Sequence, residues 1–405
     1  MGDTNRSGKE GLASNRLLLT IAYVGFISLG LPDTLIGVAW PSIRDTFGRE
    51  QSDLSYIFLG ASCSYFVSSF YTGRLLKILN VGSLLALSSG LVALSGFGYG
   101  SASIWPHFAA CALLHGLGSG AIDAGLNHYV AQHFSARHMN WLHACYSVGA
   151  MLGPIIMTSA IVGKDSWRLG YFSVAVLLLA LSILFAATRR HWEENSATAS
   201  QKTTPPASIA ETLRNSTVWL QIVLFFVYTG LEVTVGQWSF TVLTESRHLS
   251  KETAGSFVTF YWASILAGRI LFGFIVERLG LDRLIRLSTV ATLAGAALFL
   301  INFSPLISAL ALILTGLGLA AIYPCMMTRT PQRLGQRLSA HAIGFQVSGA
   351  MLGAAALPSL SGFISQRFGL EAIAAAAVGM SLLLLLLHEL ILLNSNRTGL
   401  VPAPR

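Results

Sequence analysis

Charged residues are scarce in this chain. Asp, Glu, Lys and Arg make up 11% of its 405 residues, and hydrophobic residues make up 53%, whereas an ordinary soluble domain is about 25% charged. Apolar runs recur along the whole sequence, and a run of about 20 residues is long enough to cross a hydrocarbon core of about 30 Å. This composition argues against a large soluble protein.

Strict alternation of apolar and polar residues is absent as well, which excludes a transmembrane β-barrel. Because backbone polar groups in lipid must be paired within their own segment, the long apolar runs predict helices. We expect an all-α membrane protein with twelve transmembrane helices. The predicted spans are 17–43, 53–73, 82–100, 104–131, 140–162, 168–188, 217–243, 253–276, 283–301, 306–328, 340–363 and 370–393.

Cysteine is also rare, and no pair has a CxxC spacing. All four cysteines fall within apolar runs, which is typical of small core residues and not of disulfides or metal ligands; they are Cys63, Cys111, Cys145 and Cys325. A zinc or calcium spacing, a Walker A pattern and an exposed Ser/His/Asp constellation are missing too. We therefore expect no cofactor, no bound metal and no enzymatic activity.

The basic residues give the chain a net charge of +8. They lie in short turns between apolar runs, which argues against nucleic-acid binding. With the N-terminus inside, eighteen of the 26 Lys and Arg residues fall on the cytoplasmic side and seven on the outer side. Because cytoplasmic loops of membrane proteins are enriched in Lys and Arg, we expect a multi-pass protein of the inner (plasma) membrane with both termini cytoplasmic.

Two glycine motifs recur 200 residues apart. GAMLG at Gly149 returns at Gly349, and GLGxxAI at Gly116 returns at Gly316. Glycines spaced by four let two helices approach closely, so we interpret them as packing positions without direct chemistry. A duplicated six-helix unit is typical of transporters whose site lies between two halves. The predicted domains are six-helix bundles over 1–188 and 217–405, pseudo-symmetric and joined by a cytoplasmic linker over 189–216.

Three acidic residues lie well within predicted spans: Asp33, Asp123 and Glu232. A charge at the bilayer centre costs at least about 2.5–3.5 kcal/mol, so these side chains must face a cavity or a partner. A desolvated carboxylate binds a proton more readily than one in water, and losing its charge lowers the cost of occluding it. We predict proton coupling for all three; the alternative is a buried carboxylate that only holds two helices together.

Helical spacing in the sequence places further polar residues near Asp123. Asn127 lies one helical turn away on the same face, and Asn140, His143 and Ser147 share one face of the next span. If these two spans pack as neighbours, the residues form one polar cluster. We predict a part in proton coupling for His143, whose alternative role is that of an interfacial histidine bonded to a backbone carbonyl.

A sugar site would combine aromatic faces, which meet C–H surfaces, with amides and carboxylates, which bond hydroxyl groups. Gln237, Trp238 and Gln346 are the preferred second-half candidates, and about half of the aromatic and amide candidates are expected to be core or interface residues. The full predicted substrate set is Asp33, Asn127, Asn140, Ser147, Glu232, Gln237, Trp238, Tyr261, Trp262, Tyr323 and Gln346. Arg269, the one basic residue well inside a span, is expected to pair with an acid or to cap an inner gate.

The twelve spans, the six-plus-six repeat, the long central loop and the basic turns after spans 2 and 8 resemble the major facilitator superfamily across essentially the whole chain. Within it, Asp123-xxx-Asn127, Asn140-xx-His143 and the GAMLGP that follows resemble the fucose/galactose/glucose–proton symporter branch. The resemblance implies the major facilitator fold and proton-coupled import of a hexose-type monosaccharide by alternating access. It implies that Asp33 and Asp123 take part in proton coupling and sugar binding.

The chain departs from the family pattern in one of its two basic turns. The turn at Gly73 lacks the acidic residue of the superfamily signature, whereas the copy at Gly273 keeps Glu277. Two alternatives stay open: a proton-coupled efflux antiporter for drugs or amphiphilic compounds, and a nutrient sensor or subunit that no longer transports. We expect protons in preference to sodium as the coupling ion, and a monomer whose partners are a small molecule, in the first place a sugar, and membrane lipid.

Overall fold

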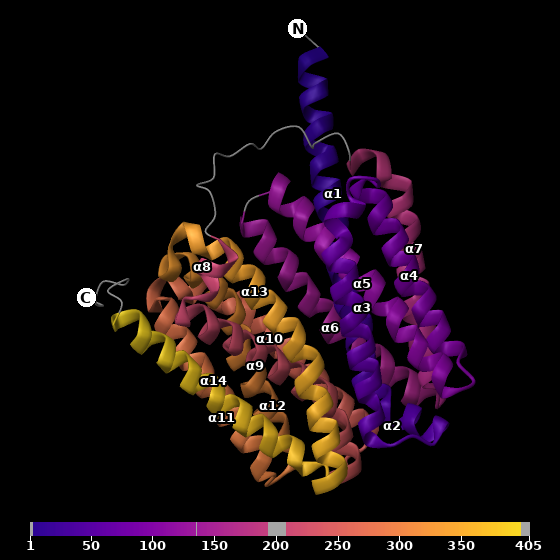
Figure 1. The fold of residues 1–405 in the computed structure, drawn as a ribbon. Coiled ribbons are helices and arrows are strands. Elements are labelled where there is room, and N and C mark those ends of the chain that lie inside the picture. The colour runs from indigo at the N-terminus through magenta and orange to yellow at the C-terminus, as the bar shows by residue number, and fades with distance from the viewer. Residues whose placement is uncertain (1–2, 135, 193–207, 398–405) are drawn as a thin grey trace. The chain divides into compact units, whose positions relative to one another are not determined.

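The computed structural model describes residues 3–134, 136–192 and 208–397, so the predicted linker over 189–216 lies partly outside it. Within these residues all regular secondary structure is helical (Figure 1). The first half contains α1 (Asp3–Asp33), α2 (Leu35–Phe47), η1 (Gln51–Asp53), α3 (Leu54–Leu75), α4 (Val81–Ser101), α5 (Trp105–His133), α6 (Ala136–Lys164), α7 (Trp167–Thr188) and η2 (Arg189–Trp192). The second half contains α8 (Ile209–Leu213), α9 (Ser216–Thr241), η3 (Val242–Ser246), α10 (Lys251–Leu279), α11 (Leu281–Ile301), α12 (Pro305–Ala320), α13 (Ile322–Phe368) and α14 (Glu371–Arg397).

The predicted spans all fall on helices. Eleven helical segments of the described chain are long and apolar enough to cross a membrane, and the remaining predicted span, 53–73, coincides with the 22 residues of α3. Gly335 separates two of the spans within α13, where its φ of 75° interrupts the helical backbone. Glycine adopts this left-handed conformation without the penalty that a side chain would bring.

The first predicted span, 17–43, is divided into α1 and α2 at Thr34. Pro32 lies in the last turn of α1, where its ring removes a backbone donor and crowds the carbonyl one turn earlier. The Thr34 hydroxyl donates to the carbonyl oxygen of Ala150 in α6 at 3.1 Å, which anchors the chain at the break. Asp33 is therefore the last residue of α1.

Helix contacts group the described residues into two compact units. The first comprises 3–35 and 60–192, and the second comprises 36–59 and 208–397. Residues 36–59 precede the other members of the second unit by about 150 positions, but their side chains bond to it, as Arg44 does to Glu245. The predicted domain boundaries follow sequence order and stay a prediction.

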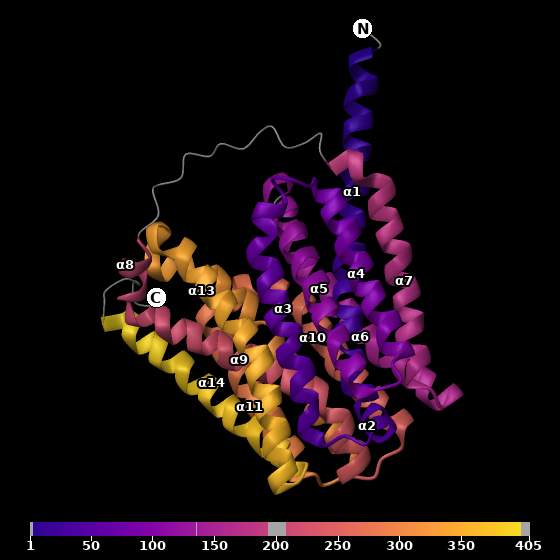
Figure 2. The same cartoon turned by 45° about the vertical axis from the view of Figure 1, so that its right-hand side comes forward.

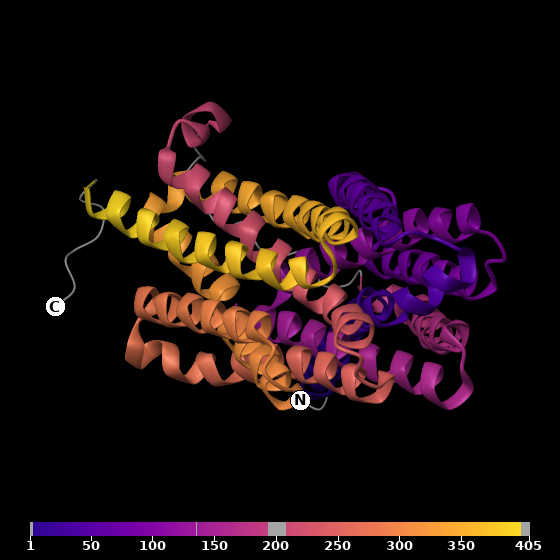
Figure 3. The same cartoon turned by 90° about the horizontal axis from the view of Figure 1, so that it is seen from below.

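Each unit has its own packing core. In the first unit α4 lies beside α5 and α7, and α6 runs along α1 (Figures 1 and 2). In the second unit α9 packs against α13 and α14, and α11 packs against α12 and α14 (Figure 3). The pairing of α1 with α6 in one unit therefore matches the pairing of α9 with α13 in the other, as a duplication predicts.

The recurring glycines lie at these matching contacts. A Cβ atom at Gly149 would overlap the carbonyl oxygen of Ile27 in α1, and one at Gly353 would overlap the carbonyl oxygen of Phe226 in α9. Gly116 and Gly316 in the same way face the backbones of α3 and α10. The interpretation of both motifs as packing positions is confirmed.

The close contact of α6 with α1 predicts a strong effect of one added methyl group. Gly149→Ala should lower the free energy of unfolding by about 1–3 kcal/mol or more, because the two backbones must separate to admit it. Gly163→Ala in the same helix is the control, since nothing lies within 4 Å of the added Cβ. Thermal unfolding of the purified protein in detergent checks both variants, and equal melting temperatures would show that the contact is not tight.

Candidate functional site

Asp33 is bonded by side chains from two other helices of the first unit. His115 Nε2 of α5 donates to Oδ1 at 2.9 Å, and the Tyr146 hydroxyl of α6 donates to Oδ2 at 3.0 Å. The Asp33 side chain is 32% exposed and that of His115 15%. The packing of α5 against α1 thus holds His115 beside Asp33, while the Asp33 carboxylate remains accessible to a ligand or to water.

Asp123 has a second set of partners in the same unit. The Tyr65 hydroxyl of α3 donates to Oδ2 at 2.6 Å, and Asn127 Nδ2 donates to Oδ1 at 2.9 Å. Both donors are neutral, so these bonds satisfy the carboxylate oxygens without adding a compensating charge. The bond between Asp123 and Asn127 confirms that the two residues share one face of their helix.

Helix α5 connects the two carboxylates. It carries His115, which binds Asp33, and Asp123 eight residues later, which places the two positions about 12 Å apart along the axis. The sequence interpretation missed His115 as well as the tyrosines Tyr65 and Tyr146. His115 could have been found, because an ionisable residue deep in the predicted span 104–131 meets the same energetic argument as the acidic ones.

The predicted α6 residues have different surroundings. The side chain of Asn140 lies outside the part of the chain that is described. The His143 ring meets Phe26 of α1 edge-on, with 5.4 Å between ring centroids, and Ser147 is 1% exposed. Helix α6 packs chiefly on α1 and only slightly on α5, so Tyr146 reaches Asp33. The roles predicted for these residues stay predictions.

In the second unit Glu232 of α9 has a cationic partner. Arg269 Nη2 of α10 lies 3.7 Å from Oε1, and the two side chains are 17% and 10% exposed. The Tyr261 hydroxyl donates to the Glu232 backbone carbonyl at 2.9 Å. Arg269 therefore pairs with an acid, one of its two predicted roles. The proton-coupling and substrate roles predicted for Glu232 stay predictions.

Other candidates of the second unit tie helices together. Trp238 is fully buried and its Nε1 donates to the Pro358 carbonyl at 3.0 Å, and Gln346 is fully buried and donates to Gln221 Oε1 at 2.8 Å. Tyr261, Trp262 and Gln237 are also buried, whereas Tyr323 is half-buried beside Phe225. Substrate binding by these residues stays a prediction, and Tyr323 has the most accessible side chain among them.

A charged network joins α2 and η1 to η3 within the second unit. Arg44 donates from Nη1 and Nη2 to Glu245 at 3.1 and 3.0 Å, and from Nη1 to Gln51 Oε1 at 2.7 Å. Trp40 Nε1 donates to the same oxygen of Gln51 at 2.9 Å. The Arg44 and Glu245 side chains are 22% and 26% exposed. We call Trp40, Arg44, Gln51 and Glu245 the Arg44 network; its bidentate ion pair is geometrically specific.

These helices and carboxylates define a membrane transporter, and the sequence model of the Major Facilitator Superfamily matches residues 22–345 and again 222–405. The chain belongs to this superfamily. Its members are transporters, so the expectation that the chain is not an enzyme is confirmed.

Several known proteins are similar to this chain. The glucose/mannose transporter GlcP of Bacillus subtilis is 24% identical over 326 residues, covering 76% of this chain and 78% of that protein. Sodium-dependent glucose transporter 1 of Homo sapiens is 23% identical over 382 residues, covering 85% and 72%. A crystal structure of the nucleoside transporter NupG superposes with a TM-score of 0.76 at 13% identity, covering 92% of this chain and 99% of that one. The predicted twelve-helix major facilitator fold is thereby confirmed.

The pair of Glu232 and Arg269 predicts a measurable coupling. Replacing Arg269 alone by Met should lower the free energy of unfolding by about 3–5 kcal/mol, because it leaves a buried charge uncompensated. The double variant Arg269→Met with Glu232→Gln should recover most of this loss.

The control for this double-mutant cycle is a second cycle on the exposed pair of Arg286 and Glu389, whose side chains are 52% and 37% exposed. Such a pair is worth about 0–1 kcal/mol. Chemical unfolding in detergent measures both cycles. If the coupling free energy of the Glu232–Arg269 pair is no larger than that of the Glu389–Arg286 pair, the buried pair does not hold α9 to α10.

Proposed function

We propose that the protein imports a hexose-type monosaccharide together with protons by alternating access, and that it lies in the inner membrane as a monomer with both termini cytoplasmic. The observation that carries this proposal is the pair of carboxylates in the first unit. Neutral donors bind Asp123, and a titratable histidine with a tyrosine binds Asp33. The names of the relatives, glucose transporters of a bacterium and of man, support sugar as the substrate class.

In this proposal Asp123 is the principal proton site. Its ionised form accepts hydrogen bonds from Tyr65 and Asn127, and proton uptake removes its charge before the site is occluded. The cost of holding a charge away from water then disappears. Asp123 and His115, the partner of Asp33, both lie on α5. A shift of this helix therefore moves Asp123 and changes the hydrogen bond of Asp33.

Sugar binding is proposed at the open side of the same unit. Asp33 and Tyr146 offer a carboxylate and a hydroxyl, and the half-buried Asn127 offers an amide, all of which bond sugar hydroxyls. We assign the Arg44 network a gating role, because a partly exposed ion pair can form in one state and break in another.

Removing the charge of Asp123 tests proton coupling. In proteoliposomes Asp123→Asn should lower the rate of sugar uptake driven by a pH gradient by at least about tenfold. The reason is that an amide side chain cannot take up and release the coupled proton. Exchange of labelled for unlabelled sugar, which needs no net proton movement, should persist. Uptake that survives unchanged, or that follows a sodium gradient instead, contradicts the proton role; Glu389→Gln is the matched acidic control.

Ligand stabilisation tests the substrate class. A ligand that binds the native state raises its stability by mass action, by about 2.7 kcal/mol at a hundred times the dissociation constant. Hexoses, pentoses and lipophilic cations are compared by thermal unfolding of the purified protein. We expect stabilisation by a hexose that Asp33→Asn abolishes. Stabilisation by the cations alone would favour the efflux antiporter and contradict the sugar proposal.

The Arg44 network makes a separate prediction. Arg44→Glu should slow uptake, and the exchanged pair Arg44→Glu with Glu245→Arg should restore much of it, because the bidentate contact can form in reverse. Initial uptake rates in proteoliposomes measure both variants. If the exchanged pair transports no faster than Arg44→Glu, the ion pair is not part of the gate.

A further inference from the structure

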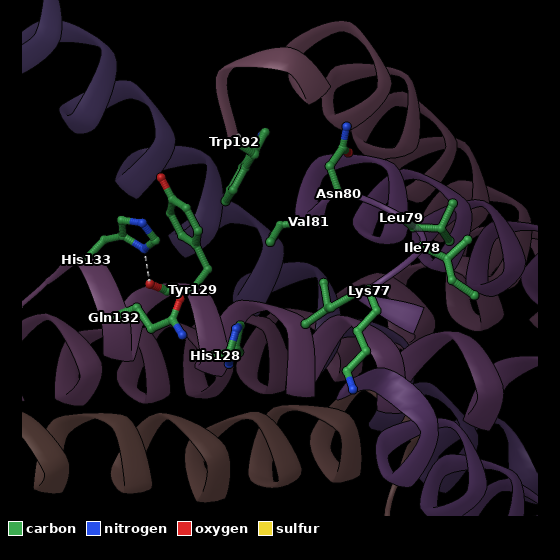
Figure 4. A pocket seen from close by; sticks show the side chains of 11 residues that line it. Lys77, Ile78, Leu79, Asn80, Val81, His128, Tyr129, Gln132, His133 and Trp192 are labelled. Atoms are coloured by element: carbon green, nitrogen blue, oxygen red, sulfur yellow. Dashed lines mark hydrogen bonds between the residues drawn. The ribbon is translucent and has the colours of Figure 1, made fainter. Parts of the chain in front are cut away.

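A pocket of about 370 Å³ lies in the first unit, and neither Asp33 nor Asp123 is among the residues that line it (Figure 4). Three segments line it: residues 76–81 where α3 is joined to α4, the last two turns of α5, and Trp192 of η2. Its polar lining consists of Lys77, Asn80, His128, Gln132 and His133, with the phenol of Tyr129 beside them. None of the described residues that line it is acidic.

The wall of this pocket is built by specific packing. Trp192 is 1% exposed, its ring lies 4.6 Å from that of Tyr129, and its Nε1 donates to Thr188 Oγ1 at 3.2 Å. A Cβ atom at Gly82 would overlap the Cα atom of Arg189, so η2 lies directly on the start of α4. These contacts hold η2 against α4 and α5 at this end of the unit.

On one side of the pocket, the His133 ring is held in place by stacking and by a hydrogen bond. The His133 ring stacks on Tyr129 with 4.3 Å between centroids, and its Nδ1 donates to the Tyr129 carbonyl at 2.8 Å. Figure 4 shows this bond as a dashed line within the pocket wall. Because a carbonyl oxygen can only accept, Nδ1 is the donor in this bond.

Three of the polar side chains are available to a ligand. Lys77, His128 and Gln132 are exposed, and their side chains make no hydrogen bond or ion pair with any residue that the structure describes. An ammonium group, an imidazole and an amide surround one hollow whose described lining contains no carboxylate. They form a set of donors for an anion with several oxygen atoms. Charge-assisted bonds of this kind are shorter and stronger than neutral ones.

The surroundings favour a phosphate group at a membrane surface. Ile78 lines the pocket and is 83% exposed, as suits contact with lipid, and Arg189 and Arg190 of η2 are exposed nearby. By the distribution of Lys and Arg, this is the cytoplasmic side, where the leaflet is rich in anionic lipids.

We propose that this pocket binds a phosphate group, carried by the headgroup of an anionic phospholipid or by a small soluble phosphate. Lys77 and His128 bind the phosphate oxygens, and Gln132 adds an amide donor. The residues of the proposed sugar and proton site do not line this pocket, and the phosphate proposal does not rest on their roles.

The test uses the full-length protein in nanodiscs. Retention of phosphatidylglycerol is measured by native mass spectrometry, and stability by thermal unfolding in phosphatidylglycerol and in phosphatidylcholine. Lys77→Gln with His128→Gln should weaken phosphatidylglycerol binding about tenfold, because hydrogen bonds to charged groups are the strong ones. The control is Arg278→Gln, which removes one exposed charge from the corresponding turn of the second unit and should bind lipid as the unaltered protein does.

A second arm distinguishes the two sources of phosphate. Glycerol 3-phosphate and inorganic phosphate are added at constant ionic strength to protein in phosphatidylcholine nanodiscs. Stabilisation that depends on Lys77 and His128 supports a soluble phosphate, whereas an effect of phosphatidylglycerol alone supports the lipid. The proposal is overturned if neither probe depends on these two residues while both variants melt in phosphatidylcholine like the unaltered protein.

Discussion

The close approach of α6 to α1 is the contact on which the candidate site depends. A Cβ atom at Gly30 would overlap the Tyr146 carbonyl oxygen, and one at Gly149 would overlap that of Ile27. Because the two backbones touch along these glycines, the Tyr146 side chain lies close enough to bond Asp33 at 3.0 Å. Any residue larger than glycine would separate the helices and remove this bond, so scaffold and site cannot be altered independently here.

The second unit repeats the scaffold without repeating the chemistry. Its corresponding contact joins α13 to α9 through Gly349 and Gly353, but Tyr323 and Met327 occupy the positions that match Asp123 and Asn127. The acidic residue predicted deep in its spans, Glu232, forms an ion pair with Arg269 at 3.7 Å. Packing requirements are the same in both units and explain the shared glycines. The carboxylate with two neutral hydrogen-bond donors, Asp123, lies in the first unit, which is why we place the proposed proton site there.

The sequence predicts what depends on spacing along one helix. The helical spans, the glycine contacts and the bond between Asp123 and Asn127 are of this kind, because apolar run length and residue spacing determine them. The bonds of Asp33 to His115 and of Asp123 to Tyr65 link different helices, so they depend on how each helix is rotated about its axis. The grouping of residues 36–59 with the second unit rests on a partner of Arg44 that lies 201 positions away, which no local pattern contains.

The break at Thr34 connects the two sets of contacts that the proposed mechanism requires. Asp33, on one side, is bonded to α5 and α6, and Arg44, eleven positions later, is bonded to Glu245. In an unbroken helix, any rotation of the part that carries Asp33 would also rotate the part that carries Arg44. With α1 ended by Pro32 and α2 beginning at Leu35, backbone torsions near Thr34 can absorb a difference between them. The break therefore lies between the proposed proton site, which belongs to the first unit, and the Arg44 network, which belongs to the second.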